Sequence, residues 1–305
     1  MRKKINLSFK ENNMTNDSLL TEKLNETGLP FQEWISNVIK KSEELGKNYI
    51  IKEYPFTFPP TVNSQLGISG SIDILAIHFP KDNHFWDKPW VIYTIECKKS
   101  KTSIKNWCFL KSSREGLENE TYFVLSENNQ NNPLDFKVQL IDNKTIAFTL
   151  LKNNIDITET VIAGYETNDL IKSLNRSQEE KIYKSLLQVM HGSRFVESKN
   201  PLIIKELNFT KEKIESVTNN RSIKVLFVPI VVTTSNLWVA NFDPSRVVDG
   251  VINPIEVKWE QKDWILYDFG LPDYLRHDDY INRAVFVVNS GYFPEFINKL
   301  SPLIR

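Results

Sequence analysis

Two apolar segments, each interrupted by one carboxylate, constrain the fold of this chain more than any other feature. Residues 71–79 (SIDILAIHF) and 90–98 (WVIYTIECK) are rich in β-branched and aromatic residues, which is typical of buried β-strands. Asp73 interrupts the first segment, and Glu96 lies near the end of the second. Two neighbouring strands that each carry a carboxylate are therefore the starting point for a functional site.

The alternation of side chains along a strand predicts how these groups meet. Residues two apart point to the same face, so Glu96 and Lys98 project together while Cys97 points away. If the two strands pair as a hairpin, Asp73 approaches the same patch. Mg²⁺ (or Mn²⁺) is held by one or two carboxylates together with water and substrate phosphate, so this set suits phosphodiester hydrolysis. Lys98 would orient or deprotonate the attacking water, or stabilise the transition state.

A second Glu-x-Lys pattern shows how weak the pattern is in isolation. Glu256 and Lys258 are preceded by Asp249, which lies on a glycine-containing turn rather than in an apolar strand. We interpret this second instance as a solvated strand edge. The first instance differs because two apolar strands and a preceding helix–strand unit surround it.

The rest of the chain predicts an α/β organisation. Residues 1–28 are polar and predict an N-terminal arm or a short helix, whereas a helix of roughly four turns is expected between Pro30 and Gly46. A strand is expected at 49–56. Further strands are expected at 122–125, 136–141, 145–151, 224–233, 237–242, 264–267 and 283–289, and helices at 178–191 and 293–300.

These elements suggest four parts: an N-terminal arm (1–28), the first part of a core (29–100), a β-rich insertion (101–176), and the closing part of the core with a C-terminal extension (177–305).

SIDILAI followed by IECKK, after a helix and a strand, resembles the restriction-endonuclease-like, or PD-(D/E)xK, nuclease superfamily. The resemblance implies an αβββαβ core, with Asp73 and Glu96 as metal ligands and Lys98 acting in catalysis. Many members also carry a metal-binding Glu on the first core helix; Glu33 is the best positional match, with Glu43 and Glu44 as rivals. The chain departs from the motif in having Ile72 where the family has proline.

Two features beside the motif fit nucleic-acid binding without deciding it. Lysines at 98, 99, 101, 105 and 111 surround Trp107 and Phe109, which could form a phosphate-tracking strip or a solvated loop with two core aromatics. Gln188, on the later helix, is either a polar helper of the metal site or an exposed helix position.

Composition excludes several other classes. Lys and Arg equal Asp and Glu at 38 each, so any nucleic-acid contact must come from a local basic patch. The four histidines and two cysteines show no zinc-ligand spacing, and no Gly-rich phosphate loop is present. With two cysteines, no signal peptide and no segment apolar enough to span a bilayer, we expect a cytoplasmic protein without a membrane partner.

The sequence therefore predicts a Mg²⁺- or Mn²⁺-dependent nuclease that acts on DNA in restriction, defence or repair, and a homodimer is plausible because cutting both strands needs two sites. Three alternatives stay open. The chain could be an RNase, a non-catalytic module that binds nucleic acid or protein on the same fold, or an interaction protein in which the motif is a coincidence.

Overall fold

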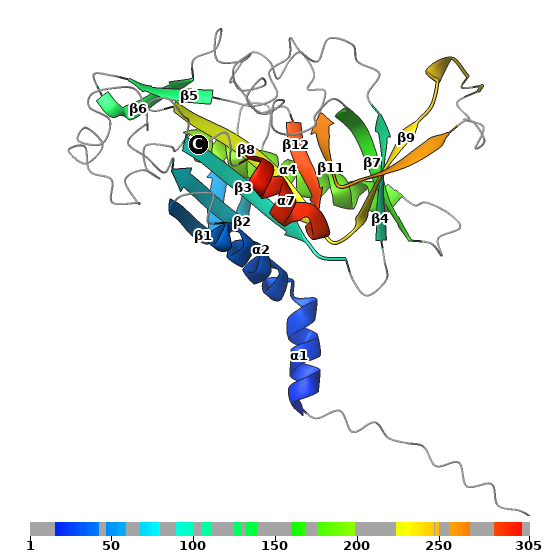
Figure 1. Ribbon diagram of the computed structural model, residues 1–305, viewed down its shortest axis with the longest axis horizontal. Helices are drawn as coiled ribbons and strands as arrows, with labels where there is room; N and C mark the ends of the chain where they lie inside the picture. Colours follow the sequence, from blue (N-terminus) through cyan, green and yellow to red (C-terminus); the bar gives the residue numbers. More distant parts are fainter. Residues whose placement is uncertain are drawn as a thin grey trace, which may run out of the picture.

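The computed structural model describes residues 16–42, 47–58, 68–79, 90–100, 105–111, 125–129, 132–138, 160–168, 176–198, 224–246, 248–249, 257–268 and 284–300 (Figure 1). In chain order the elements are α1 (Asn16–Glu26), α2 (Leu29–Lys41), β1 (Lys47–Phe58), β2 (Ile68–Phe79), β3 (Trp90–Lys98), β4 (Lys105–Lys111), β5 (Leu125–Asn129), β6 (Asn132–Val138), β7 (Thr160–Asn168), α4 (Arg176–Ser198), β8 (Lys224–Thr233), β9 (Asn236–Asn241), the 3₁₀ helix η3 (Pro244–Arg246), β10 (Lys258–Lys262), β11 (Trp264–Asp268), β12 (Ala284–Asn289), the 3₁₀ helix η6 (Ser290–Tyr292) and α7 (Phe293–Leu300).

One mixed sheet organises these elements. Its strands follow the order β1-β2-β3-β8-β12-β11-β7-β4-β9-β10, with β5 attached to β8 and β6 attached to β5. β1, β2 and β3 pair antiparallel, whereas β3, β8 and β12 run parallel to one another. The expected α/β class, a mixed sheet flanked by helices, is confirmed at this level.

Helices cover both faces of the sheet (Figure 1). α2 and α7 pack on one face with the alternate β8 residues Leu226, Val228, Ile230 and Val232, whereas α4 packs on the other face, where Val231 lies. Because both faces of β8 are buried, its sequence is an almost continuous apolar run rather than an alternating one.

Local sequence explains where α2 forms. Pro30 occupies the first turn, where its missing N–H costs no helical hydrogen bond, and Gly28 precedes the helix with φ of 81°. Phe31, Ile35 and Ile39 recur at four-residue steps and are buried against the sheet. The helix ends at Lys41, and residues 43–46, up to the expected stop at Gly46, lie outside the described residues.

The lysine-rich segment after β3 contains the strand β4 in place of the solvated loop that was one of its two alternatives, and the two core aromatics of that alternative are confirmed. In β4, Trp107 and Phe109 are buried and pack with α4, so neither ring is available for stacking on a nucleic-acid base. β4 pairs with β7 and β9, and β5 pairs with β8, so the strands described within 101–176 belong to the same sheet as the rest. The strand expected at 145–151 lies outside the described residues. Of the strands expected at 122–125 and 136–141, only Leu125 and residues 136–138 are described.

Within the described ranges, no helix has both the length and the apolar character needed to cross a membrane.

Candidate active site

β2 leaves β3 at the position of Asp73. Their regular pairing runs from His78↔Val91 to Ile74↔Ile95. Beyond it, the Cys97 N–H donates a 2.7 Å hydrogen bond to the Asp73 carboxylate. The side chain of Asp73 thus takes over a role that backbone carbonyls fill in the regular ladder. The carboxylate is held against the end of β3, next to Glu96.

The β1–β2 ribbon also changes helix layers at this point. Ile74 packs in the cluster that includes α2, whereas Ile72 lies against Gly192 of α4. Residues two apart in a regular strand share a face, so the ribbon must turn over between them, at Asp73. Glu53, opposite Asp73 in β1, has φ of 51°, an unusual value for a non-glycine residue that accompanies such irregularities. Asp73 therefore lies in the plane of the sheet, between the two helix layers.

The end of β3 is fixed where Lys98 projects. β3 stays paired with β8 as far as Lys98↔Thr233, and the Thr234 N–H donates to the Lys98 carbonyl. The Ser100 N–H in turn donates to Thr234 Oγ1 at 2.8 Å. These bonds hold the backbone of Lys98, so its side chain reaches back toward Glu96.

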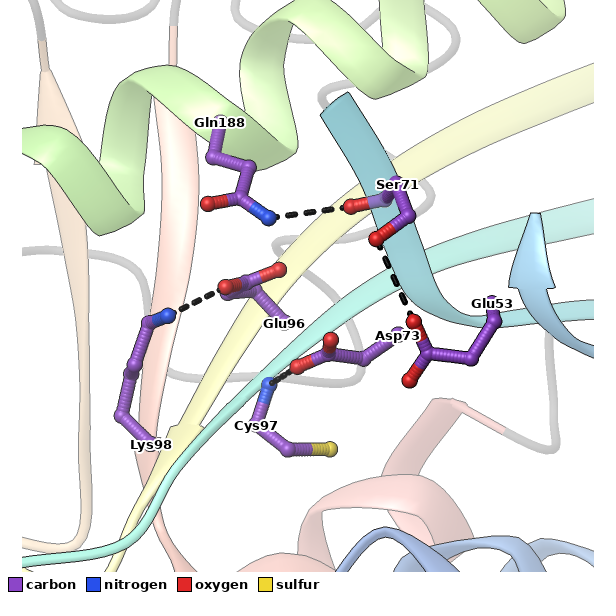
Figure 2. Close-up of polar contacts among 7 residues, drawn as sticks. All are labelled: Glu53, Ser71, Asp73, Glu96, Cys97, Lys98 and Gln188. Carbon is purple, nitrogen blue, oxygen red and sulfur yellow. Dashed lines mark hydrogen bonds and ion pairs between the residues drawn. The ribbon is translucent and has the colours of Figure 1, made fainter. Parts of the chain in front are cut away.

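The three residues predicted from the motif come together (Figure 2). Glu96 is 1% exposed and Asp73 is 9% exposed. Lys98 Nζ forms an ion pair with Glu96 Oε1, while Glu96 Oε2 is buried and has no hydrogen-bond partner among the described residues. The geometry expected from the strand periodicity is thus present.

Burial and mutual repulsion dominate the electrostatics of the pair. Burial raises the pKa of Asp73, against the opposing effects of the Cys97 N–H and the Lys98 charge. Burial, with the negative charge of Asp73, raises the pKa of Glu96 to about 7. Two carboxylates that repel one another in a poorly solvated position favour a cation between them.

Among the described residues, no contact joins Glu33 to Asp73 or Glu96. Its side chain is 57% exposed and forms an ion pair with Lys52 of β1, which lowers the pKa of Glu33. Its rivals Glu43 and Glu44 lie outside the described residues. The proposed metal-binding role of Glu33 stays a prediction.

Glu53 is the acidic residue that sequence reasoning missed. Its negative charge raises the pKa of both Asp73 and Glu96, and it accepts a 3.2 Å hydrogen bond from Ser71 Oγ (Figure 2). The antiparallel register that brackets it, Lys52↔Ile74 and Tyr54↔Ile72, places it opposite Asp73. Glu53 could have been identified only from that register, and no local sequence pattern predicts the register.

Amide side chains approach from both helix layers. Gln188 of α4 donates a 2.9 Å hydrogen bond to the Ser71 carbonyl, two residues before Asp73. From the opposite layer, the side chain of Gln32 on α2 lowers the pKa of Asp73. Gln188 is thus a half-buried neighbour of the site. Gln32, the residue before Glu33, is an α2 residue that acts on Asp73.

The described part of the second Glu-x-Lys pattern lies on an exposed edge of the sheet. Lys258 begins the edge strand β10 with its side chain 78% exposed and pairs with Glu260 at 3.3 Å. Asp249 is exposed, and Glu256 lies outside the described residues. What is described agrees with the interpretation as a solvated edge.

The donor set fits a hard divalent cation. Mg²⁺ keeps several waters and takes only one or two protein carboxylates, which Asp73 and the unpaired oxygen of Glu96 can supply. In the described parts of the chain, no three His, Cys, Asp or Glu side chains converge as a preformed metal cage. Water and substrate would have to complete the coordination.

Comparisons of this chain with protein-family models, with curated proteins and with solved structures give no match.

The raised pKa of Glu96 predicts a pH-dependent stability. The folded state holds the Glu96 proton up to about pH 7, whereas the unfolded chain releases it near its ordinary value. The metal-free protein therefore loses stability as pH rises between these values. Glu96→Gln should raise the free energy of unfolding at pH 8 by about 3 kcal/mol, and with it the melting temperature, and should have little effect near pH 4.5. Thermal unfolding of both proteins with a chelator present, across this pH range, measures it. An equal effect at both pH values would contradict it.

Gly192 predicts a second stability effect. A Cβ atom there would come within 2.5 Å of Ile72 Cγ1, so α4 or β2 would have to move. In a helix without such a neighbour, Gly→Ala stabilises by about 1 kcal/mol, but overpacking costs about 1–3 kcal/mol. Gly192→Ala should therefore lower the melting temperature, with the exposed-site variant Lys184→Ala as the control. A rise would mean that α4 does not pack this closely on β2.

Proposed function

We propose that this protein is a divalent-metal-dependent nuclease that hydrolyses phosphodiester bonds, with DNA as the expected substrate. The observation that carries the proposal is the state of Glu96. Its carboxylate is buried beside Asp73, with one oxygen paired to Lys98 and the other without a partner among the described residues.

Charge balance supports a cation at this position. With both acids ionised, Asp73, Glu96 and Lys98 together carry one negative charge. A buried carboxylate without a partner is costly, and proteins retain such groups where a metal or a substrate offsets the cost. A structural ion pair would need only one acid beside Lys98.

The order of elements supports a restriction-endonuclease-like core. α2, β1, β2, β3, α4 and β8 follow one another as αβββαβ, apart from the strands inserted between β3 and α4. Within the sheet, β1, β2, β3 and β8 are neighbours, with β8 parallel to β3. Residues of β2 and β3 then supply the acidic pair and the lysine, as in the resemblance drawn from the sequence.

Each residue has a distinct role in the proposed reaction. Asp73 and Glu96 would hold the Mg²⁺ or Mn²⁺, which when bound supplies positive charge to the phosphate and lowers the pKa of water. Lys98, paired to Glu96 and 35% exposed, can orient the attacking water and stabilise negative charge on the phosphate. The Cys97 N–H keeps Asp73 in place. A role in restriction, defence or repair is proposed by analogy with the superfamily that the motif resembles.

Incubation of the purified protein with Mn²⁺ and three substrates tests the proposal: duplex DNA, single-stranded DNA and RNA. We expect cleavage of DNA that stops when a chelator is added and is absent from Glu96→Ala prepared in parallel. Cleavage of RNA alone would favour the RNase alternative. Activity that is equal in wild type and variant would come from a contaminant or another site and would contradict the proposal.

A further inference from the structure

We propose that Glu53 is a further metal-binding residue of this site, which exchanges its hydrogen bond with Ser71 for the cation when the cation binds. The inference rests on the proposed function, because it adds a residue to the same metal site. Glu53 comes from β1, so the site would draw acidic groups from three consecutive strands.

Strand pairing places Glu53 beside Asp73. The pairs Lys52↔Ile74 and Tyr54↔Ile72 bracket these two residues, so they occupy opposite positions on neighbouring strands. The backbone is irregular at this position, with φ of 51° at Glu53, but the two carboxylates remain close enough for the charge of Glu53 to raise the pKa of Asp73. Figure 2 draws the two carboxylates next to each other.

Glu53 is held in a resting position that it can leave. Its Oε2 accepts a 3.2 Å hydrogen bond from Ser71 Oγ, and its side chain is exposed. A long hydrogen bond between a hydroxyl and an exposed carboxylate contributes little net stability, so a cation can displace it. This position explains why no three acidic side chains among the described residues converge as a preformed cage.

The unpaired Glu96 oxygen indicates independently that a ligand belongs here. Glu96 is 1% exposed, and its Oε2 has no hydrogen-bond partner in the described part of the chain. In Figure 2 that oxygen points away from Lys98, toward the side where Ser71, Asp73 and Glu53 lie. A cation reached by Glu96 from this side has Asp73 and Glu53 as its nearest acidic neighbours.

The charges of the four groups agree with one divalent cation. Asp73, Glu96 and Glu53 carry three negative charges and Lys98 one positive charge, which leaves two to be balanced. Glu33 does not enter this count, because Lys52 already neutralises it.

Mn²⁺ titration by calorimetry, without nucleic acid, tests the inference on the full chain. Wild type, Asp73→Asn, Glu53→Gln and Glu295→Gln are compared. We expect Asp73→Asn to abolish binding and Glu53→Gln to weaken it by about tenfold or more. Glu295→Gln is the matched control, because it removes an exposed carboxylate that pairs with Lys299 on α7; we expect it to change the affinity less than twofold.

The outcomes separate the two proposals. If Glu53→Gln and Glu295→Gln bind Mn²⁺ alike while Asp73→Asn does not, the inference about Glu53 is wrong and the proposed metal site stands. If wild type binds no Mn²⁺, both fail. In the nuclease assay, Glu53→Gln should raise the Mn²⁺ concentration that gives half-maximal activity far more than it lowers kcat at saturating Mn²⁺; a loss confined to kcat would also overturn the inference.

Discussion

Glu96→Gln should reduce nuclease activity by about 10³-fold while producing a protein that is more stable than wild type above pH 7. The variant keeps the shape of the side chain but loses the negative charge that would hold the cation against the phosphate. Interactions of this kind, aimed at charge that develops in the transition state, contribute about 10²–10³-fold each. The same buried charge costs stability in the metal-free protein, because Glu96 is 1% exposed and repelled by Asp73.

The opposite signs of the two effects make this prediction specific. A variant that is inactive because it misfolds loses stability, whereas Glu96→Gln should gain it. Initial rates of DNA cleavage in Mn²⁺ and melting temperatures at pH 8 are the two measurements. Glu260→Gln is the control, since Glu260 lies on the edge strand β10 and pairs with Lys258 and Lys262. An active Glu96→Gln variant would remove Glu96 from the site.

Lys98→Ala should lower activity by about 10²–10³-fold, again without unfolding the protein. Lys98 is the positive group in contact with Glu96, and its charge lowers the pKa of both Asp73 and Glu96. Its removal deletes the group that acts on water, an effect worth about 10²–10⁴-fold for a positioned acid or base. It also makes both carboxylates hold their protons to higher pH.

Lys99→Ala is the control, because Lys99 Nζ donates to the Asn25 carbonyl of α1 and not to either carboxylate. We expect it to change activity less than threefold. Single-turnover cleavage rates at saturating Mn²⁺ separate a chemical defect from weak metal binding. If both variants lost activity equally, the lysines would act as a general phosphate-attracting surface, and Lys98 would have no individual role.

Local patterns predicted the parts of this site that depend on short-range geometry. Glu96 and Lys98 share a face because they are two apart in one strand, and the boundaries of β3 and β8 coincide with the predicted apolar runs. Asp73 meets them because β2 and β3 are neighbours both in sequence and in the sheet. The first relation follows from alternation alone, whereas the second also requires the two strands to pair as a hairpin.

Relations that depend on strand register, or on strands far apart in the chain, could not be predicted because they leave no local sequence pattern. Glu53 faces Asp73 only through the register of β1 on β2 and the irregular backbone at φ of 51°, and neither leaves a periodic signal. The positional match to the superfamily's first core helix indicated Glu33, whose metal-binding role stays a prediction, whereas the α2 residue that lowers the pKa of Asp73 is its neighbour Gln32. The sheet beyond β12 is built from strands far apart in the chain, so β4 could not be distinguished from a basic loop before its partners were known.

The central claim is that Asp73 of β2 and Glu96 of β3 hold one divalent cation. The two residues lie just beyond the point where the regular pairing of these strands ends. Anomalous diffraction from crystals soaked in Mn²⁺ measures this most directly. The account predicts one strong peak within about 2.5 Å of a carboxylate oxygen from each residue, lost in crystals of Glu96→Gln. A wild-type map with no peak there, at a Mn²⁺ concentration that supports cleavage, would contradict it.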